Sequence, residues 1–149
     1  MHISTRGRYG LRALVDLAAH AGRGPVALRE IAGRQDISES YLEQVFAALR
    51  KAGLVIAIRG PQGGYELGKP AEEITAGEVL RALEGPLTPV ECVVELGGGR
   101  RCRREAICPT RGFWRELGRH IETFVNEVTL EDLVKRAAMA QADLPMYYI

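Results

Sequence analysis

The segment from Val26 to Pro70 constrains the fold most, because helical and strand patterns follow one another there at short intervals. Apolar residues at helical spacing predict a short helix over Leu28 to Arg34 and a second helix that begins at Ser38 and stops at Gly53. Only the turn "QDI" lies between the two helices. Two short helices joined by about three residues are typical of a helix-turn-helix.

A predicted β-hairpin follows the second helix directly. Residues 54–58 are rich in β-branched side chains, the "GPQGG" segment turns the chain, and residues 65–67 alternate between the two faces of a strand. The glycines do not form a phosphate-binding loop, because "GPQGGY" lacks the Gly-Lys-Ser/Thr ending and no helix follows it. A hairpin at this place predicts the wing of a winged helix.

Four further helices complete the expected fold. One runs from Thr5 to about residue 21, another begins at the Thr75 and Glu78 capping box, and a last one begins at Thr129 with Asp132. Between them, a heptad seam predicts a long helix that needs a partner: Trp114, Leu117, Ile121, Phe124 and Val128. An ordinary core helix would show the same pattern. We expect a mainly α fold with a small β-hairpin wing, divided into a DNA-binding domain (1–85), a cysteine-containing sensor loop (86–112) and a dimerisation helix with a C-terminal helix and tail (113–149).

Composition and charge narrow the class of protein. Among 149 residues, 46% are hydrophobic and 26% are charged, which is typical of a globular protein. Residues 1–70 carry ten Lys and Arg against six Asp and Glu, whereas residues 71–149 carry ten against thirteen. The basic front half is compatible with nucleic-acid binding. The N-terminus reads as neither a signal peptide nor a membrane helix, so we expect a cytoplasmic protein. No pairing of a nucleophile with a base is recognisable, so we expect no enzyme.

Four stretches together carry a resemblance to a known family: "ISTRGRYGLRALVDLA", "ISESYLEQVFAALRKAGLV", "IRGPQGGYELGKP" and "ITAGEVLRALEG". The chain resembles, over nearly its whole length, the Rrf-type winged-helix transcription regulators, whose branches are IscR-like, NsrR-like and CymR-like. The resemblance implies a homodimeric DNA-binding regulator, and we expect a repressor. In some branches it also implies an iron–sulfur cluster that senses cluster status, nitric oxide or redox state.

The predicted second helix supplies the candidate DNA contacts. Glutamine pairs with adenine and glutamate accepts from cytosine, while hydroxyl groups hold phosphates or bases. Arginine late in the helix suits phosphates, and the family places an arginine of the "RGP" wing in the minor groove. A two-fold dimer implies double-stranded DNA with an inverted repeat. The candidate DNA-binding residues are Ser38, Ser40, Tyr41, Glu43, Gln44, Arg50 and Arg59.

The three cysteines lie between the capping-box helix and the heptad helix. Nine residues separate Cys92 from Cys102, and five separate Cys102 from Cys108. Thiolates bind iron–sulfur clusters and zinc, and cluster-binding relatives carry three cysteines in this loop. The resemblance therefore implies a 2Fe–2S or 4Fe–4S cluster on these thiols. Where the cluster-assembly regulator has a histidine, this chain has Arg111. The fourth ligand stays open among Glu91, Glu95, Glu105, His2 and an external small molecule.

Other readings of the loop stay open. Arg100, Arg101, Arg103 and Arg104 would favour thiolates, so the cysteines could form a metal-free redox switch. A structural zinc site, inert thiols and a regulator that binds a small metabolite are further alternatives. From another class, the chain could be an iron–sulfur electron carrier or scaffold, but the helix-turn-helix and Arg59 would then have no role.

Overall fold

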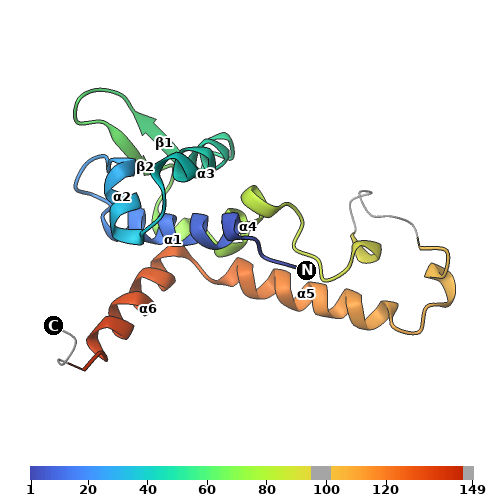
Figure 1. Cartoon of the computed structure of the whole chain (residues 1–149). Coiled ribbons are helices and arrows are strands. Elements are labelled where there is room, and N and C mark those ends of the chain that lie inside the picture. Colours follow the sequence, from blue (N-terminus) through green and yellow to red (C-terminus); the bar gives the residue numbers. More distant parts are fainter. Residues whose placement is uncertain (95–101, 146–149) are drawn as a thin grey trace.

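The structure is a computed structural model that describes residues 1–94 and 102–145. Within these ranges the chain forms six α-helices, one β-hairpin and three short 3-10 helices, which confirms the expected mainly α, winged-helix fold (Figure 1). The elements are, in order, α1 (Thr5–Ala19), α2 (Leu28–Gln35), α3 (Glu39–Lys51), β1 (Val55–Ile58), β2 (Gly64–Leu67), η1 (Ala71–Glu73), α4 (Ala76–Glu84), η2 (Glu91–Val93), η3 (Glu105–Ile107), α5 (Arg111–Glu127) and α6 (Leu130–Ala142).

The hydrophobic core lies where α1, α3 and α4 meet beneath the hairpin. Leu14 of α1, Phe46 of α3 and Val79 of α4 are all fully buried in it, and Leu130 at the start of α6 closes one side. Burying a side chain of this size stabilises the fold by roughly 1.5–3 kcal/mol. The helical spacing of the apolar residues therefore does select the buried faces.

The helix starts follow the capping residues that the sequence predicts. The Ser38 hydroxyl accepts a hydrogen bond from the Tyr41 amide at 3.3 Å, and both halves of the Thr75 and Glu78 capping box are present. Thr129 and Asp132 form a second complete capping box. Helix α1 ends at Ala19 and is therefore slightly shorter than expected. The three 3-10 helices were not predicted, because each has too few residues to show a periodic pattern in the sequence.

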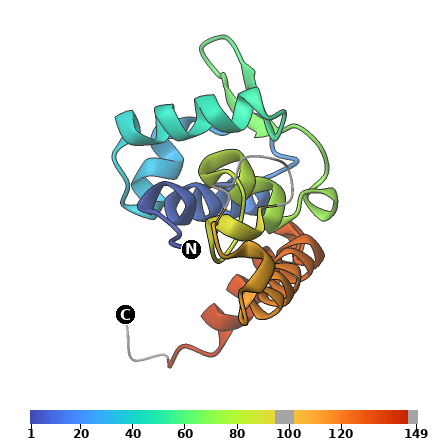
Figure 2. The ribbon, with the colours of Figure 1, turned by 90° about the vertical axis from the view of Figure 1, so that its right-hand side faces the viewer.

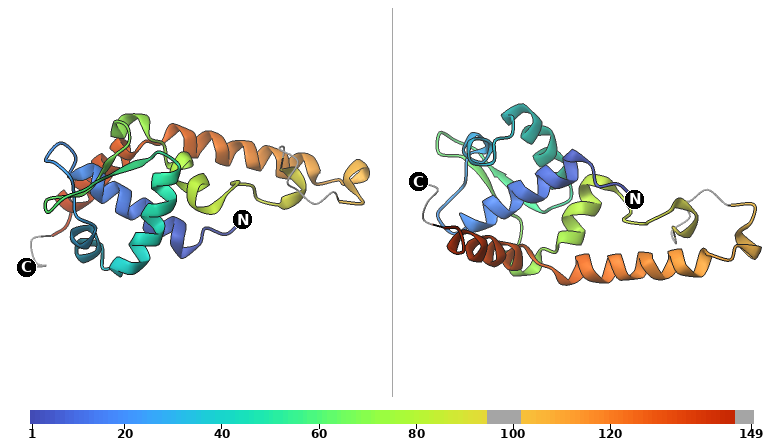
Figure 3. Two further views of the ribbon diagram at one scale, coloured as in Figure 1. Left: turned by 90° about the horizontal axis from the view of Figure 1, so that it is seen from above. Right: turned by 60° about the horizontal axis from the view of Figure 1, so that its bottom comes forward.

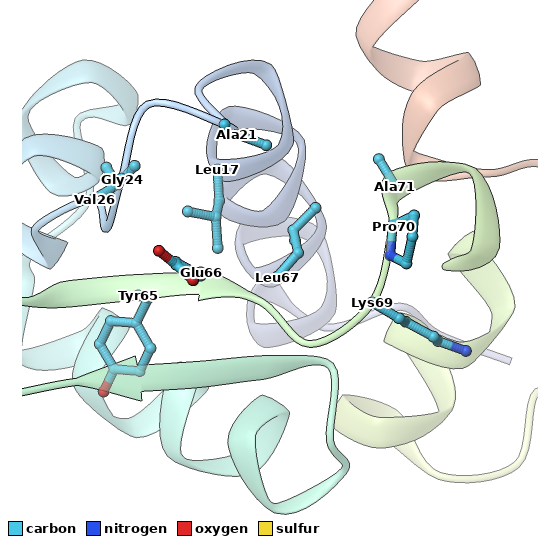
Figure 4. A pocket seen from close by; sticks show the side chains of 11 residues that line it. Leu17, Ala21, Gly24, Val26, Tyr65, Glu66, Leu67, Lys69, Pro70 and Ala71 are labelled. Atoms are coloured by element: carbon cyan, nitrogen blue, oxygen red, sulfur yellow. The ribbon is translucent and has the colours of Figure 1, made fainter.

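The hairpin is tied to the helical body at its root. Its strands pair antiparallel, with Val55 opposite Leu67, and a bridge joins Val26 to Tyr65 through two backbone hydrogen bonds of 2.9 and 2.8 Å. Gly64 permits this approach, because a Cβ atom there would lie 2.3 Å from the Val26 carbonyl oxygen. A pocket of about 510 Å³ lies beside the root, where Leu17 and residues 65–67 contribute to its wall (Figure 4).

Helix α5 runs away from the helical body (Figures 1 and 2). Gly118 alone is buried in α5, all of which the structure describes. Its base is held against α4 by an ion pair of 2.7 Å between Arg81 and Glu122. Helix α6 then returns to pack against α1, as the views of Figure 3 show. None of the described helices is long and apolar enough to cross a bilayer.

A close contact between α1 and α4 explains two glycines of the "GRYG" segment. The Glu84 carboxylate accepts hydrogen bonds from the backbone amides of Ser4, at 2.9 Å, and Gly7, at 3.0 Å. A Cβ atom at Gly7 would lie 2.4 Å from the Glu84 carboxylate, and one at Gly10 would lie 2.2 Å from the Leu83 side chain. The negative carboxylate also suits the positive end of the α1 dipole.

We predict that Gly7→Ala lowers the free energy of unfolding by about 1–3 kcal/mol, because the added methyl group displaces the Glu84 carboxylate from its donors. Gly33→Ala is the matched control, since Gly33 is also helical but has open space around it. The control should gain up to about 1 kcal/mol from helix propensity. Urea unfolding measures both variants, and equal effects would contradict the role of Glu84.

Candidate DNA-binding surface and cysteine loop

One face of α3 is polar and open to solvent. Leu42, Val45, Phe46 and Leu49 bury the opposite face in the core, which fixes the rotation of the helix. As a result most of the predicted contact residues on α3 point outward. The exposed members are Ser38, Ser40, Glu43, Gln44 and Arg50.

Tyr41 differs from its neighbours because its ring is half-buried against α1. It meets the Tyr9 ring edge to face at a centroid distance of 6.0 Å, and the Arg12 guanidinium lies 5.3 Å from the Tyr9 centroid. Tyr41 therefore holds α3 on α1 as well as being available to a ligand. Tyr9 was not among the residues expected at this surface, because its partner Tyr41 lies more than one helix away along the chain.

The hairpin tip lies at the same end of the molecule as α3 (Figures 1 and 2). Arg59 is exposed at the start of the turn, next to Gly60, whose φ of 120° only glycine adopts easily. The exposed face of α3 and the hairpin turn that carries Arg59 therefore present hydrogen-bonding groups and a positive charge at one end of the molecule. This is the arrangement with which a winged helix meets two adjacent DNA grooves.

The three cysteines are all free thiols at the far end of the molecule. Cys92 lies in η2, Cys102 is exposed, and Cys108 lies between η3 and α5. Among residues 1–94 and 102–145, no three His, Cys, Asp or Glu side chains are grouped so that they could hold a metal ion. The donor types fit an iron–sulfur cluster or zinc. Their arrangement in the described part of a single chain does not form the site.

The pKa of the Cys108 thiol lies below its ordinary value. Hydrogen bonds from the side chain and backbone of Thr110 lower the pKa of Cys108, and the Arg111 amide and the Arg104 charge act in the same direction. The sulfur lies 3.5 Å from the Thr110 hydroxyl oxygen. Its position before the first turn of α5 therefore favours the thiolate, the form that binds metals and reacts with oxidants.

Arg111, found where the family resemblance implies a histidine, forms an ion pair with Glu105 across the end of the loop. One of the candidate fourth ligands is thus already engaged within the chain. Glu91 and His2 are exposed, and the N-terminal amine of Met1 donates to the Pro89 carbonyl at 3.0 Å. This contact brings the N-terminal segment to the start of the cysteine loop. Glu95, Arg100 and Arg101 lie outside the described residues.

Comparison with known proteins places these features in a family context. Residues 3–136 match the profile of the Rrf2 family, described as an iron-dependent transcriptional regulator. The HTH-type transcriptional regulator IscR of Serratia proteamaculans is 44% identical over 134 residues, which cover 90% of this chain and 79% of that protein.

Two solved structures share the fold. CymR, the global cysteine regulator of B. subtilis, is 41% identical with a TM-score of 0.74, and the match covers 91% of this chain and 98% of that one. The IscR of T. potens is 40% identical with a TM-score of 0.76, covering 100% of this chain and 97% of that one. The fold, with its six helices and hairpin, is therefore shared with transcriptional regulators of both types.

We predict that the two roles of Tyr41 can be separated. Tyr41→Phe keeps the ring against Tyr9, so the free energy of unfolding should hardly change, and DNA affinity should fall about threefold to tenfold through loss of one hydrogen bond. Tyr41→Ala should also lose about 2 kcal/mol of stability. Urea unfolding and a DNA titration measure the two effects. If Tyr41→Phe unfolds as easily as Tyr41→Ala, the ring packing is not what stabilises the helix.

Proposed function

The chain belongs to the Rrf2 family of winged-helix transcriptional regulators, and from this premise we propose that it is a homodimeric repressor whose DNA affinity depends on its three-cysteine loop. The observation that supports this most is that the exposed polar face of α3 and the hairpin turn, which begins at Arg59, lie at one end of the molecule (Figure 1). The loop that carries the cysteines joins the DNA-reading body to α5.

In the proposed complex, the N-terminal half of α3 enters the major groove. Gln44 would pair with adenine and Glu43 would accept from cytosine, whereas Ser38, Ser40 and Tyr41 would contact bases or phosphates. Arg50 lies on the last turn of α3 and would neutralise a phosphate. Arg59 would enter the adjacent minor groove, where a narrow A/T-rich sequence concentrates negative potential.

The proposed dimer contact is the apolar face of α5. Phe113 is 59% exposed and Phe124 is 61% exposed, so part of the apolar stripe of α5 is not covered within the single chain. Covering such side chains in a second copy would remove a large apolar surface from water. A two-fold dimer of this kind would read an inverted-repeat operator. We accordingly assign residues 1–85 to DNA binding, 86–112 to sensing and 113–149 to dimerisation.

Cys92, Cys102 and Cys108 would hold an iron–sulfur cluster if one binds. The cluster would supply a redox-active centre on soft thiolate ligands. This chain would contribute the thiolate of Cys108, which its hydrogen bonds already favour, while Arg111 and Glu105 remain paired at the loop's end. The fourth ligand would then be His2, Glu91, Glu95 or a small molecule.

A regulator without a cluster is the second candidate. The lowered pKa of Cys108 favours it, because a thiolate reacts with oxidants and disulfides faster than a thiol. In that case the same loop would respond to thiol oxidation. Both candidates keep the DNA-binding surface and differ only in what the cysteines bind or become.

We predict that Arg59→Ala weakens DNA binding by about tenfold, mainly at operators whose minor groove is A/T-rich where the wing makes contact. The effect depends on sequence because the lost contact depends on the width of the minor groove. Arg136→Ala is the control, since Arg136 is exposed and belongs to α6, which lies away from α3 and the hairpin (Figure 1). Gel shifts at graded salt on duplexes selected by the wild-type chain measure the effect. Equal loss of affinity on all sequences would mean that Arg59 touches only phosphate.

The wild-type chain tests the proposed function as a whole. A ratio of specific to non-specific DNA affinity near one would contradict the proposal that the chain is a transcriptional regulator.

We predict that anaerobically purified protein contains iron and acid-labile sulfide and absorbs visible light through sulfur-to-iron charge transfer. Each of Cys92→Ser, Cys102→Ser and Cys108→Ser should lose most of this iron, since a soft thiolate is replaced by a hard hydroxyl group. Elemental analysis and visible spectra measure the loss. Absence of iron after anaerobic reconstitution would remove the cluster and leave the thiol alternative, whereas stoichiometric zinc would indicate a structural site.

A further inference from the structure

A buried carboxylate joins α1 to the end of α2. Within the described parts of the chain, Asp16 is the one charged residue that is buried, and its side chain is only 4% exposed. Arg34 donates to it through Nε at 3.1 and 3.0 Å and through Nη2 at 2.7 Å, and the Gln35 amide donates at 2.9 Å. The His20 Nδ1 atom lies 3.6 Å from the same carboxylate. Both carboxylate oxygens are therefore satisfied.

The partners of Asp16 lie immediately before the turn into α3. Arg34 and Gln35 are the last two residues of α2, and Asp36 follows in the left-handed conformation with φ 52° and ψ 53°. Ile37 is then buried, and the next residue caps α3. The turn thus has little freedom on either side, so the direction in which α2 ends determines the direction in which α3 begins.

Arg12 strengthens the same junction from one turn earlier on α1. Its guanidinium donates to the backbone carbonyl of Gln35 and lies 3.4 Å from the Gln35 side-chain oxygen. A cation at the C-terminal carbonyls of a helix also complements the helix dipole. Two α1 side chains, Asp16 and Arg12, therefore hold the side chains and the backbone at the end of α2. We call this set, Arg12, Asp16, Arg34 and Gln35, the α1–α2 clasp.

The ionic character of the clasp calls for a reason other than stability. Burial raises the pKa of Asp16, but the hydrogen bonds from Arg34 and Gln35 outweigh it and leave the pKa below its ordinary value. A buried ion pair often adds no more stability than well-packed apolar side chains of similar volume would. The ion pair does fix the relative orientation of the two side chains, since the bidentate geometry of arginine with a carboxylate allows one arrangement.

We propose that Asp16 is a positioning residue for DNA recognition, which sets the angle of α3 through the α1–α2 clasp. This rests on the proposed DNA-binding function. Helix α3 has 13 residues and is about 20 Å long, so a tilt of about 10° moves its far end by roughly 3 Å. That displacement equals the length of a hydrogen bond and breaks contacts to base edges, whereas contacts to flexible phosphate-binding side chains survive it.

The test compares charge removal with apolar replacement in the full chain. The variants are Asp16→Asn, the double variant Asp16→Leu with Arg34→Leu, and the control Glu72→Gln, an exposed carboxylate in η1. Each is measured by urea unfolding and by titration with two probes. One probe is a duplex selected by the wild-type chain from random sequences, and the other is a duplex of unrelated sequence.

We expect Asp16→Asn to lose both stability and specific affinity. The double variant should unfold at a urea midpoint near that of the wild type, yet bind the selected duplex about tenfold more weakly or worse, with unchanged affinity for the unrelated duplex. Wild-type affinity for the selected duplex in the double variant would overturn the proposal, because the clasp would then only stabilise. Equal loss on both duplexes would overturn it too, since Arg34 would merely contact phosphate.

A second measurement needs no DNA. Residual dipolar couplings of backbone amides give the angle between α1 and α3 in the free protein, and we expect this angle to change in the double variant but not in Glu72→Gln. An unchanged angle would contradict the proposal. If the wild type shows no selective DNA binding, the proposed function fails and the angle alone decides the role of Asp16. If the double variant does not fold, Gln35→Met, which removes one donor, is tested with the same two readouts.

Discussion

The packing of α4 on α1 is the contact on which the remaining structure depends. Gly7 and Gly10 bring the two helices close enough for Glu84 to bind the amides at the start of α1 and for Leu83 to lie against its backbone. Helix α1 in turn carries α2, α3 and α6. Because protein interiors are densely packed, a shift of α4 cannot be absorbed locally and is passed to the helices that share α1. The candidate DNA-binding surface of α3 is therefore supported through α1.

Features set by neighbouring residues were predictable from the sequence. Ser38, the Thr75 capping box and the Thr129 capping box act within one helical turn, so their spacing alone identifies three helix starts. The hairpin followed from strand residues on both sides of a glycine turn. The same local rules placed the buried face of α3 correctly, and hence the exposure of most of its predicted contact residues.

Features that join distant segments were not predictable from the sequence. The Tyr9 and Tyr41 contact and the α1–α2 clasp each depend on the path of the chain between the two partners. Arg12 and Asp16 gave one signal in advance, since two charged residues interrupt the apolar pattern of α1. The cysteine spacing likewise could not predict a site, because thiols ten and six positions apart can lie together or apart depending on how the loop folds.

A connected series of contacts runs from the cysteine loop to α3. The loop leaves the end of α4, where Glu84 holds the start of α1, and the clasp near the other end of α1 holds the turn into α3. Any ligand that biases DNA binding from the loop must favour one of two arrangements of such contacts, because it can shift the equilibrium only by its differential affinity for them. The bidentate geometry of Asp16 with Arg34 allows one arrangement of the two side chains, so any other arrangement requires the ion pair to break. The α1–α2 clasp is consequently suited to pass an angular change at α1 to the end of α2 and so to the start of α3.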